Sequence, residues 1–179
     1  KKDGTPGLLM ALLVGRTDAA IAFLDALPKF KSLKLLTSDQ ILEIAQANWR
    51  GTPGLALALE SGNPATIKAY FEEIKTLGLE KDRAWIKSIF EAKNNDGTPG
   101  LRWALQFDNP AAIKAYFEEI KTLGLEKDTE WIKSIFEAKD NNGNLGLRWA
   151  LQFGKPATIK AYFDGLKSFA IDQDTEWIK

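Results

Sequence analysis

The sequence predicts an all-α protein, a right-handed α-solenoid of about four tandem 46–47-residue repeats with three helices in each repeat. A Gly-Thr-Pro-Gly-Leu motif starts at Gly4, Gly51 and Gly97 and returns as Gly-Asn-Leu-Gly-Leu at Gly143, so the spacings are 47, 46 and 46 residues. Apolar residues recur at the i, i+3, i+4 spacing of helices. No part of a repeat alternates with the period of two that strands require, so we expect no strands.

The repeats divide the chain into four units of a single domain, 1–179. Units two and three are identical at 36 of 46 positions, and unit four matches unit three at 23 of its 37 positions, which indicates tandem duplication. Because unit four is nine residues shorter than unit three (46 − 37), we expect the chain to be a fragment of a longer protein. The units are 4–50, 51–96, 97–142 and the truncated 143–179.

The first helix of a repeat is clearest in unit three, where we expect it near 99–107. Thr98 is a good N-cap residue, and Pro99 at the first helical position costs nothing because the N–H there has no partner inside a helix. This helix should bury one stripe, formed by Leu101, Ala104 and Leu105.

Two further helices complete unit three. The second opens at 109–110, an Asn-Pro pair, and ends at Gly124, which accepts the left-handed conformation common after helices. The third begins after Asp128 as its cap. Lys114 should point to solvent. The residues we expect to be buried are Ile113, Tyr116, Phe117, Ile120 and Leu123 in the second helix, and Trp131, Ile132, Ile135 and Phe136 in the third.

Unit one follows the same plan with different residues. We expect its helices near 6–14, 18–30 and 37–48, and a loop from Pro28 to Thr37 that absorbs the change of register. Thr37 and Gln40 have the spacing of a capping box. They precede the apolar residues Ile41, Leu42, Ile44 and Ala45.

The composition limits the functions that the chain can carry. Lys and Arg number 24, as do Asp and Glu, so zero net charge removes the attraction that drives non-specific nucleic-acid or membrane binding. The absence of His and Cys excludes a thiolate nucleophile, an imidazole base, a disulfide and a zinc site with sulfur ligands. The longest apolar run, Leu8–Val14, has 7 residues, whereas a membrane span needs about 18. The localisation stays open.

Three patterns that resemble functional motifs have simpler structural interpretations. The Gly-Thr-Pro-Gly motif lacks the Lys-Ser/Thr pair of a phosphate loop and fits a helix cap. Segment 140–144 alternates oxygen-bearing side chains, but its Gly comes too early for a calcium loop, which favours a turn. The carboxylate pairs 72–73 and 118–119 should lie on a solvated outer face. We therefore predict no enzymatic activity, no metal and no cofactor.

A second apolar stripe on the first helix is the most informative feature. Trp103 and Phe107 lie about 200° around the helix from the core residue Leu101. Of the ten differences between units two and three, five fall at positions 56, 57 and 60–62, on this helix. The candidate partner-binding residues are Trp103, Phe107, Trp149 and Phe153, flanked by Arg102, Gln106, Arg148 and Gln152.

Two interpretations of this stripe remain open. The first helices of stacked repeats commonly line a concave surface, and Trp and Arg frequently anchor partners there. Alternatively, the stripe packs inside the core against a neighbouring third helix, as aromatic stripes on helices commonly do.

Unit one offers a different apolar surface. It carries Leu9 and Leu13 where unit three has Arg102 and Gln106, so its first helix is apolar on every side. We expect a missing N-terminal unit or a partner chain to cover this N-terminal association face, and the exposed end repeats to allow self-association.

The first two helices resemble ankyrin repeats. The segment 98–105, Thr-Pro-Gly-Leu-Arg-Trp-Ala-Leu, is similar to the Thr-Pro-Leu opening of ankyrin, and 111–117 resembles its second helix. The 46-residue period and third helix depart from the 33-residue ankyrin unit and are closer to armadillo or HEAT repeats. The motif also resembles ankyrin-like repeats in secreted effector and enterotoxin proteins of Gram-negative bacteria. The resemblance implies protein–protein recognition without catalysis and carries over no specific residues.

These observations predict a protein–protein interaction module that binds a protein or peptide on the surface of the first helices. The alternative is a structural spacer or self-assembly solenoid with no ligand on the concave face. Base readout by Arg102, Trp103 and Gln106 is a third class, but zero net charge disfavours it.

Overall fold

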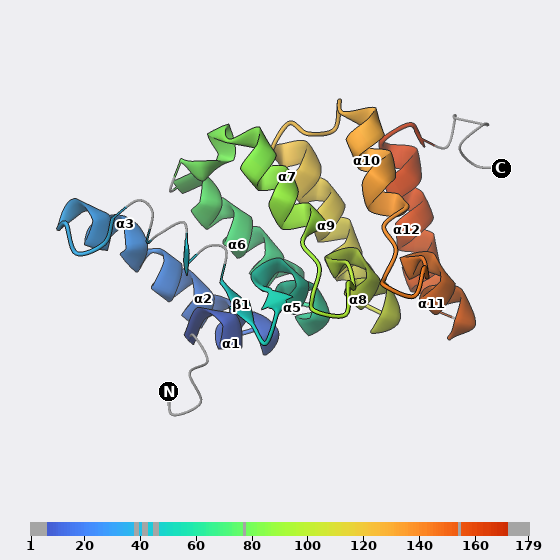
Figure 1. Ribbon diagram of the computed structural model, residues 1–179, viewed down its shortest axis with the longest axis horizontal. Helices are drawn as coiled ribbons and strands as arrows, with labels where there is room; N and C mark the ends of the chain where they lie inside the picture. Colours follow the sequence, from blue (N-terminus) through green and yellow to red (C-terminus); the bar gives the residue numbers. More distant parts are fainter. Residues whose placement is uncertain are drawn as a thin grey trace.

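Helices make up most of the computed structural model in Figure 1, which describes residues 7–37, 40, 43–44, 47–76, 78–153 and 155–171. The all-α class that the periodicity predicts is confirmed. In chain order the elements are α1 (Gly7–Leu13), α2 (Thr17–Leu24), α3 (Ala26–Ser32), β1 (Asn48–Trp49), β2 (Thr52–Pro53), α5 (Gly54–Ser61), α6 (Pro64–Thr76), the 3₁₀ helix η1 (Leu79–Lys81), α7 (Arg83–Glu91), α8 (Gly100–Gln106), α9 (Pro110–Thr122), α10 (Thr129–Phe136), α11 (Gly146–Gln152) and α12 (Pro156–Ser168).

Most of the helices lie in two rows (Figure 1). The A row consists of α1, α5, α8 and α11, and the B row of α2, α6, α9 and α12. Each helix packs against the next helix of its row and against its neighbour in the other row. The C helices α7 and α10 contact the B row through aromatic rings: Phe90 of α7 stacks on Phe71 of α6 and meets Tyr116 of α9 edge-on.

The buried side chains form one hydrophobic cluster that extends from α1 to α12. Leu123 is half-buried rather than buried, whereas Lys114 is exposed as expected. The other residues that the sequence assigns to the core of unit three are all buried, namely Leu101, Ala104, Leu105, Ile113, Tyr116, Phe117, Ile120, Trp131, Ile132, Ile135 and Phe136.

The predicted caps at Asp128 and Thr37 are present, whereas Asn109 is the N-cap of α9 without a capping hydrogen bond from its side chain. The Asp128 carboxylate accepts the Trp131 N–H at 3.2 Å. In unit one, Gln40 N–H donates to Thr37 Oγ1 at 3.2 Å and Thr37 N–H donates to Gln40 Oε1 at 2.9 Å, which completes the capping box. The start of α8 differs by one residue, because Pro99 is extended at ψ 150° and serves as the N-cap itself.

The prediction that the chain has no strands is wrong at one place. Asn48–Trp49 pairs antiparallel with Thr52–Pro53, and single bridges join Lys93 to Pro99 and Lys139 to Leu145 at the same point of the next units. Each ladder closes a turn held by an Asx side chain; in the first, Asn48 Oδ1 accepts the Gly51 N–H at 3.0 Å. Pairing over two residues is too short to produce an alternating pattern.

Unit one departs from its predicted helices. The helix expected over 18–30 is two helices, α2 and α3, which meet at Asp25. Because α3 continues to Ser32, the loop is shorter than predicted. Half of the predicted helix 37–48, including Ile41, Leu42 and Ala45, lies outside the described residues, and Ile44 packs half-buried against the core.

Candidate functional site

Two aromatic pairs occupy equivalent positions on α8 and α11. The ring of Trp103 stacks on that of Phe107, with centroids 5.5 Å apart and planes 7° from parallel. Trp149 and Phe153 repeat this arrangement at 6.0 Å and 20°. Both tryptophans are half-buried, whereas Phe107 is 45% exposed and Phe153 is 52% exposed. These four residues, the aromatic strip, therefore combine a half-covered ring with a more open one in each pair.

The turn that follows Phe107 is held by contacts to the preceding unit. Directly after it, Asp108 takes a left-handed conformation with φ 62°, which ends α8 and turns the chain toward α9. The Asn109 amide then donates to the carbonyl oxygens of Leu59 at 3.2 Å and Glu60 at 3.1 Å, at the end of α5. The exposed ring of Phe107 therefore directly precedes a turn whose hydrogen bonds connect the end of α8 to the end of α5.

Arg102 does not flank the strip at its rim, and the prediction for this residue is wrong. Its Cζ lies 4.3 Å from the centroid of the Trp149 ring, in the next unit. Its Nη1 donates to Thr98 Oγ1 at 2.7 Å and its Nη2 is 3.7 Å from Asp140 Oδ2, and 12% of the side chain is exposed. Burial lowers the pKa of Arg102, and the neighbouring Asp140 and Asp96 oppose that effect. Arg102 therefore makes a cation–π contact with Trp149 from a largely buried position between units three and four.

The other predicted flanking residues remain accessible to different degrees. Gln106 is half-buried, and Arg148 and Gln152 are exposed. Arg148 is the unit-four equivalent of Arg102, and its Nη1 donates to Asn144 Oδ1. These side chains place two amides and one cation at the ends of the A helices beside the aromatic strip.

Glycines let successive A helices approach closely. A Cβ added to Gly146 would lie 2.8 Å from Leu105 Cδ1 and 3.4 Å from Arg102 Cα, and one added to Gly100 would lie 3.2 Å from Leu59 Cδ1. This approach explains why Arg102 lies between two units, since its position on α8 faces the start of α11.

The same packing overturns the predicted N-terminal association face. Leu9 is 1% exposed and faces Gly54 of α5, where an added Cβ would meet it at 3.5 Å. Leu13 is half-buried and packs against the core. At Leu9, therefore, α5 of the same chain provides the cover that the sequence assigns to a missing N-terminal unit or a partner chain.

The carboxylate pairs are divided between solvent and the helix interface. Glu72 and Glu118 are exposed as predicted, but Glu73 is 7% exposed and Glu119 is 4% exposed. Burial, together with a hydrogen bond to Asp25 and its charge, raises the pKa of Glu73 to about 7. Burial also raises the pKa of Glu119, although Lys75 Nζ lies 3.5 Å from its Oε2. Each carboxylate thus joins two units.

The segment 140–144 forms a turn through its own side chain. Asp140 Oδ1 accepts the N–H groups of Asn142 and Asn144, each at 2.9 Å, and Oδ2 accepts from the Asn144 amide at 3.2 Å. The Asn144 N–H is the main reason that the pKa of Asp140 lies below its ordinary value. Asn94 in unit two accepts the Thr98 N–H at 2.8 Å in the same way, so an Asx turn recurs at this position.

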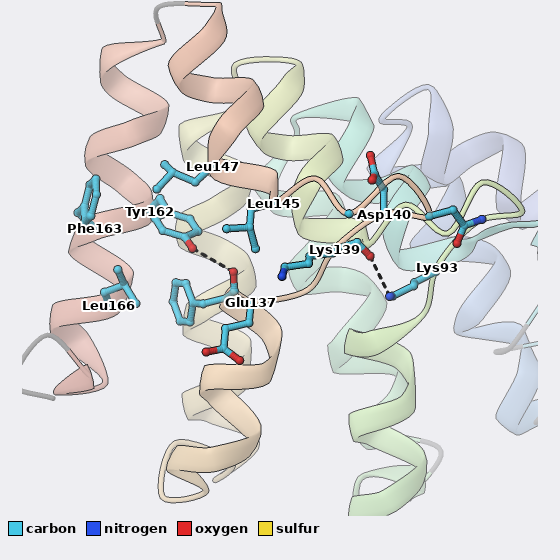
Figure 2. Close-up of a pocket in the computed structure, with 12 residues that line it drawn as sticks. Lys93, Glu137, Lys139, Asp140, Leu145, Leu147, Tyr162, Phe163 and Leu166 are labelled. Atoms are coloured by element: carbon cyan, nitrogen blue, oxygen red, sulfur yellow. Dashed lines mark hydrogen bonds between the residues drawn. The ribbon is translucent and has the colours of Figure 1, made fainter. Parts of the chain in front are cut away.

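Sequence reasoning missed an apolar opening beside α12. Figure 2 shows Leu145 and Leu147 on one side and Tyr162, Phe163 and Leu166 of α12 on another, around a cavity of about 1110 Å³. Alignment of the units gives the missing signal, because Phe163 is equivalent to Phe117, which a C helix covers.

Within the described ranges, no helix is long and apolar enough to cross a bilayer, and no three acidic side chains gather as metal ligands would. The indole N–H groups of Trp103 and Trp149 are buried and, among the described residues, have no hydrogen-bond partner.

Compared with known proteins, the chain matches no protein-family model and no curated protein.

Proposed function

We propose that the chain is an α-solenoid of tandem 46–47-residue repeats that acts as a protein-interaction module and binds a protein or peptide on the aromatic strip. Its repeat character is supported by the recurrence of the sequence at 46 residues and by the way each A and B helix packs on the next. In this proposal the ankyrin-like resemblance concerns the mode of recognition and not a particular partner.

The observation that carries the proposal is the exposure of Phe107 and Phe153 on top of their tryptophans. Two phenylalanines 46 residues apart each expose about half of their surface, at 45% and 52%. Each is held in place by a stacked indole, so little side-chain entropy remains to be lost when a partner docks. Rigid aromatic residues that are already ordered are typical anchors of protein interfaces.

The proposal gives the module no catalytic role. The carboxylates with raised pKa values, Glu73 and Glu119, face neighbouring helices at 7% and 4% exposure and not an open cavity. The chain contains no His or Cys that could act as base or nucleophile.

A peptide selection tests the proposal. A random peptide library is panned against the wild-type chain, and the affinity of each selected peptide is measured for two double variants. Phe107→Ala with Phe153→Ala should weaken binding at least about tenfold, because each removes an aromatic anchor. Phe23→Ala with Phe30→Ala is the matched control, since both rings are 39% exposed but lie outside the strip. Peptides that lose affinity equally for both variants would contradict the assignment.

Self-assembly is the second candidate function, and one observation favours it. Leu151 on α11 is 59% exposed, whereas its equivalents Leu105 and Leu59 are 1% and 0% exposed because the next A helix covers them. An end-to-end contact would cover Leu151 in the same way. Light scattering tests this: self-assembly predicts oligomers that Leu151→Glu dissociates, and a monomer at all concentrations would refute it.

A further inference from the structure

The cavity beside α12 is an apolar groove that is larger than the cavities at the equivalent positions of the preceding units. We call this cavity the unit-four groove (Figure 2). Polar residues lie at its edge, and its apolar lining consists of Phe136, Leu145, Leu147, Tyr162, Phe163 and Leu166. Lys93 Nζ donates to the Lys139 carbonyl at 3.0 Å along that edge, which ties the loops of units two and three together.

Smaller cavities occupy the same place in the preceding units. In unit three a cavity of about 290 Å³ is lined by Pro99, Leu101 and Tyr116, the equivalents of Leu145, Leu147 and Tyr162. In unit two the equivalent cavity measures about 410 Å³. A C helix and the segment just after it narrow both cavities. The lining residues are Ser88, Ile89 and Ala92 in unit two, and Ser134, Ile135 and Ala138 in unit three. The unit-four groove measures about 1110 Å³.

The exposure of Phe163 identifies what such a groove receives. Phe71 stacks on Phe90 at 4.8 Å, and Phe117 stacks on Phe136 at 5.0 Å, each ring meeting the C helix of its own unit. These two B-row phenylalanines are 0% and 3% exposed, whereas the equivalent Phe163 is 44% exposed. Phe163 therefore exposes ring surface at a position where, in both preceding repeats, the phenylalanine of a C helix stacks on the equivalent ring.

We propose that the unit-four groove is the seat of a C helix of the same type as α7 and α10, whose isoleucine closes the cavity and whose phenylalanine stacks on Phe163. The sequence supports this occupant, because 174–179 repeats 128–133 identically, and 128–133 contains the cap and the first turn of α10. The groove shares no residue with the aromatic strip, so this proposal and the proposed function can fail separately.

The test extends the chain after Lys179 by nine residues copied from 134–142, which contain Ile135 and Phe136. A matched extension carries Ser in place of both apolar residues. Urea unfolding should show a folding equilibrium constant at least about tenfold higher for the first extension than for the second, because only the first buries apolar surface in the groove. The gain should shrink in a Phe163→Ala background and persist in a Lys160→Ala background, since Lys160 is exposed on the same helix.

Three results would overturn the proposal. Equal stabilisation by both extensions would mean that added length, and not the apolar pair, matters. No stabilisation by either would mean that the groove does not accept this helix. A gain that Phe163→Ala leaves unchanged would place the added helix elsewhere on the molecule.

Discussion

The packing of the B row can be tested with one pair of equivalent substitutions, Phe117→Ala and Phe163→Ala. The two residues occupy the same position of successive repeats, 46 residues apart. Phe117 is 3% exposed, stacks on Phe136 at 5.0 Å and meets Phe169 edge-on at 5.8 Å. Phe163 is 44% exposed. Truncation to Ala should therefore destabilise the protein by different amounts at these two equivalent positions.

The magnitudes follow from the burial. Truncation of an enclosed phenylalanine removes its apolar contacts and leaves a cavity, which costs about 3–5 kcal/mol. Phe117 is enclosed, and Gly165 of α12 packs so closely that an added Cβ would lie 2.3 Å from its ring. Phe163 has water over nearly half of its surface, so its loss removes about half of the 1.5–3 kcal/mol of full burial, about 1 kcal/mol, and encloses no cavity.

Urea unfolding followed by circular dichroism at 222 nm measures both changes. We expect Phe117→Ala to lower the free energy of unfolding by at least about 2 kcal/mol more than Phe163→Ala. Lys114→Ala, at an exposed site of α9, should stay within about 0.5 kcal/mol of wild type. Equal losses for the two phenylalanines would refute the assignment of Phe117 to the core and of Phe163 to an open groove.

Three further predictions concern other parts of the chain. The folded state holds a proton on Glu73 up to about pH 7, above the ordinary pKa of 4.5, so stability should fall as pH rises between these values; Glu73→Gln should flatten that part of a pH series of urea midpoints. Trp103→Ala combined with Trp149→Ala should destabilise the chain by less than about 5 kcal/mol in thermal unfolding, because both rings are half-buried; a larger loss would place them in the core. Asp128→Ala should cost about 1 kcal/mol in the same assay through loss of the α10 cap, and an unchanged melting temperature would exclude that role.

Sequence reasoning predicts the elements that depend on local signals. The spacing of Ile113, Phe117 and Ile120 is enough to place one face of α9 in the core, because a helix has a fixed period. The caps at Asp128 and Thr37 are equally local, since donor and acceptor lie within three residues. The sequence also locates the aromatic strip, as near-identical repeats place Trp149 and Phe153 where Trp103 and Phe107 lie.

Features that depend on the neighbouring repeat could not be predicted from a single helix. A helical wheel places Arg102 beside the strip, but only the approach of α11 at Gly146 shows that the guanidinium is covered. The same holds for Leu9, which α5 covers, and for Glu73, which looks solvated on α6 alone but meets Asp25 where α2 packs on α6. In each case the sequence predicts which face of its helix the side chain occupies, but it does not predict which neighbouring helix covers that face.

The unit-four groove was missed for a related reason. Its signal is a comparison between repeats: Phe163 has the sequence environment of Phe117 but a different exposure. The periodicity of apolar residues within one helix cannot predict that difference in exposure between Phe117 and Phe163. It becomes visible when the same position is followed through successive units.

Photocrosslinking from the aromatic strip shows whether this surface binds a partner protein. A benzophenone amino acid is placed at position 107, at position 153, or at position 30 as an exposed control outside the strip, and each protein is irradiated in an extract of its source cells. Binding on the strip predicts one discrete protein adduct shared by positions 107 and 153 and absent from position 30. Adducts that are the same at all three positions, or absent from the strip, would contradict the claim that this surface binds a partner.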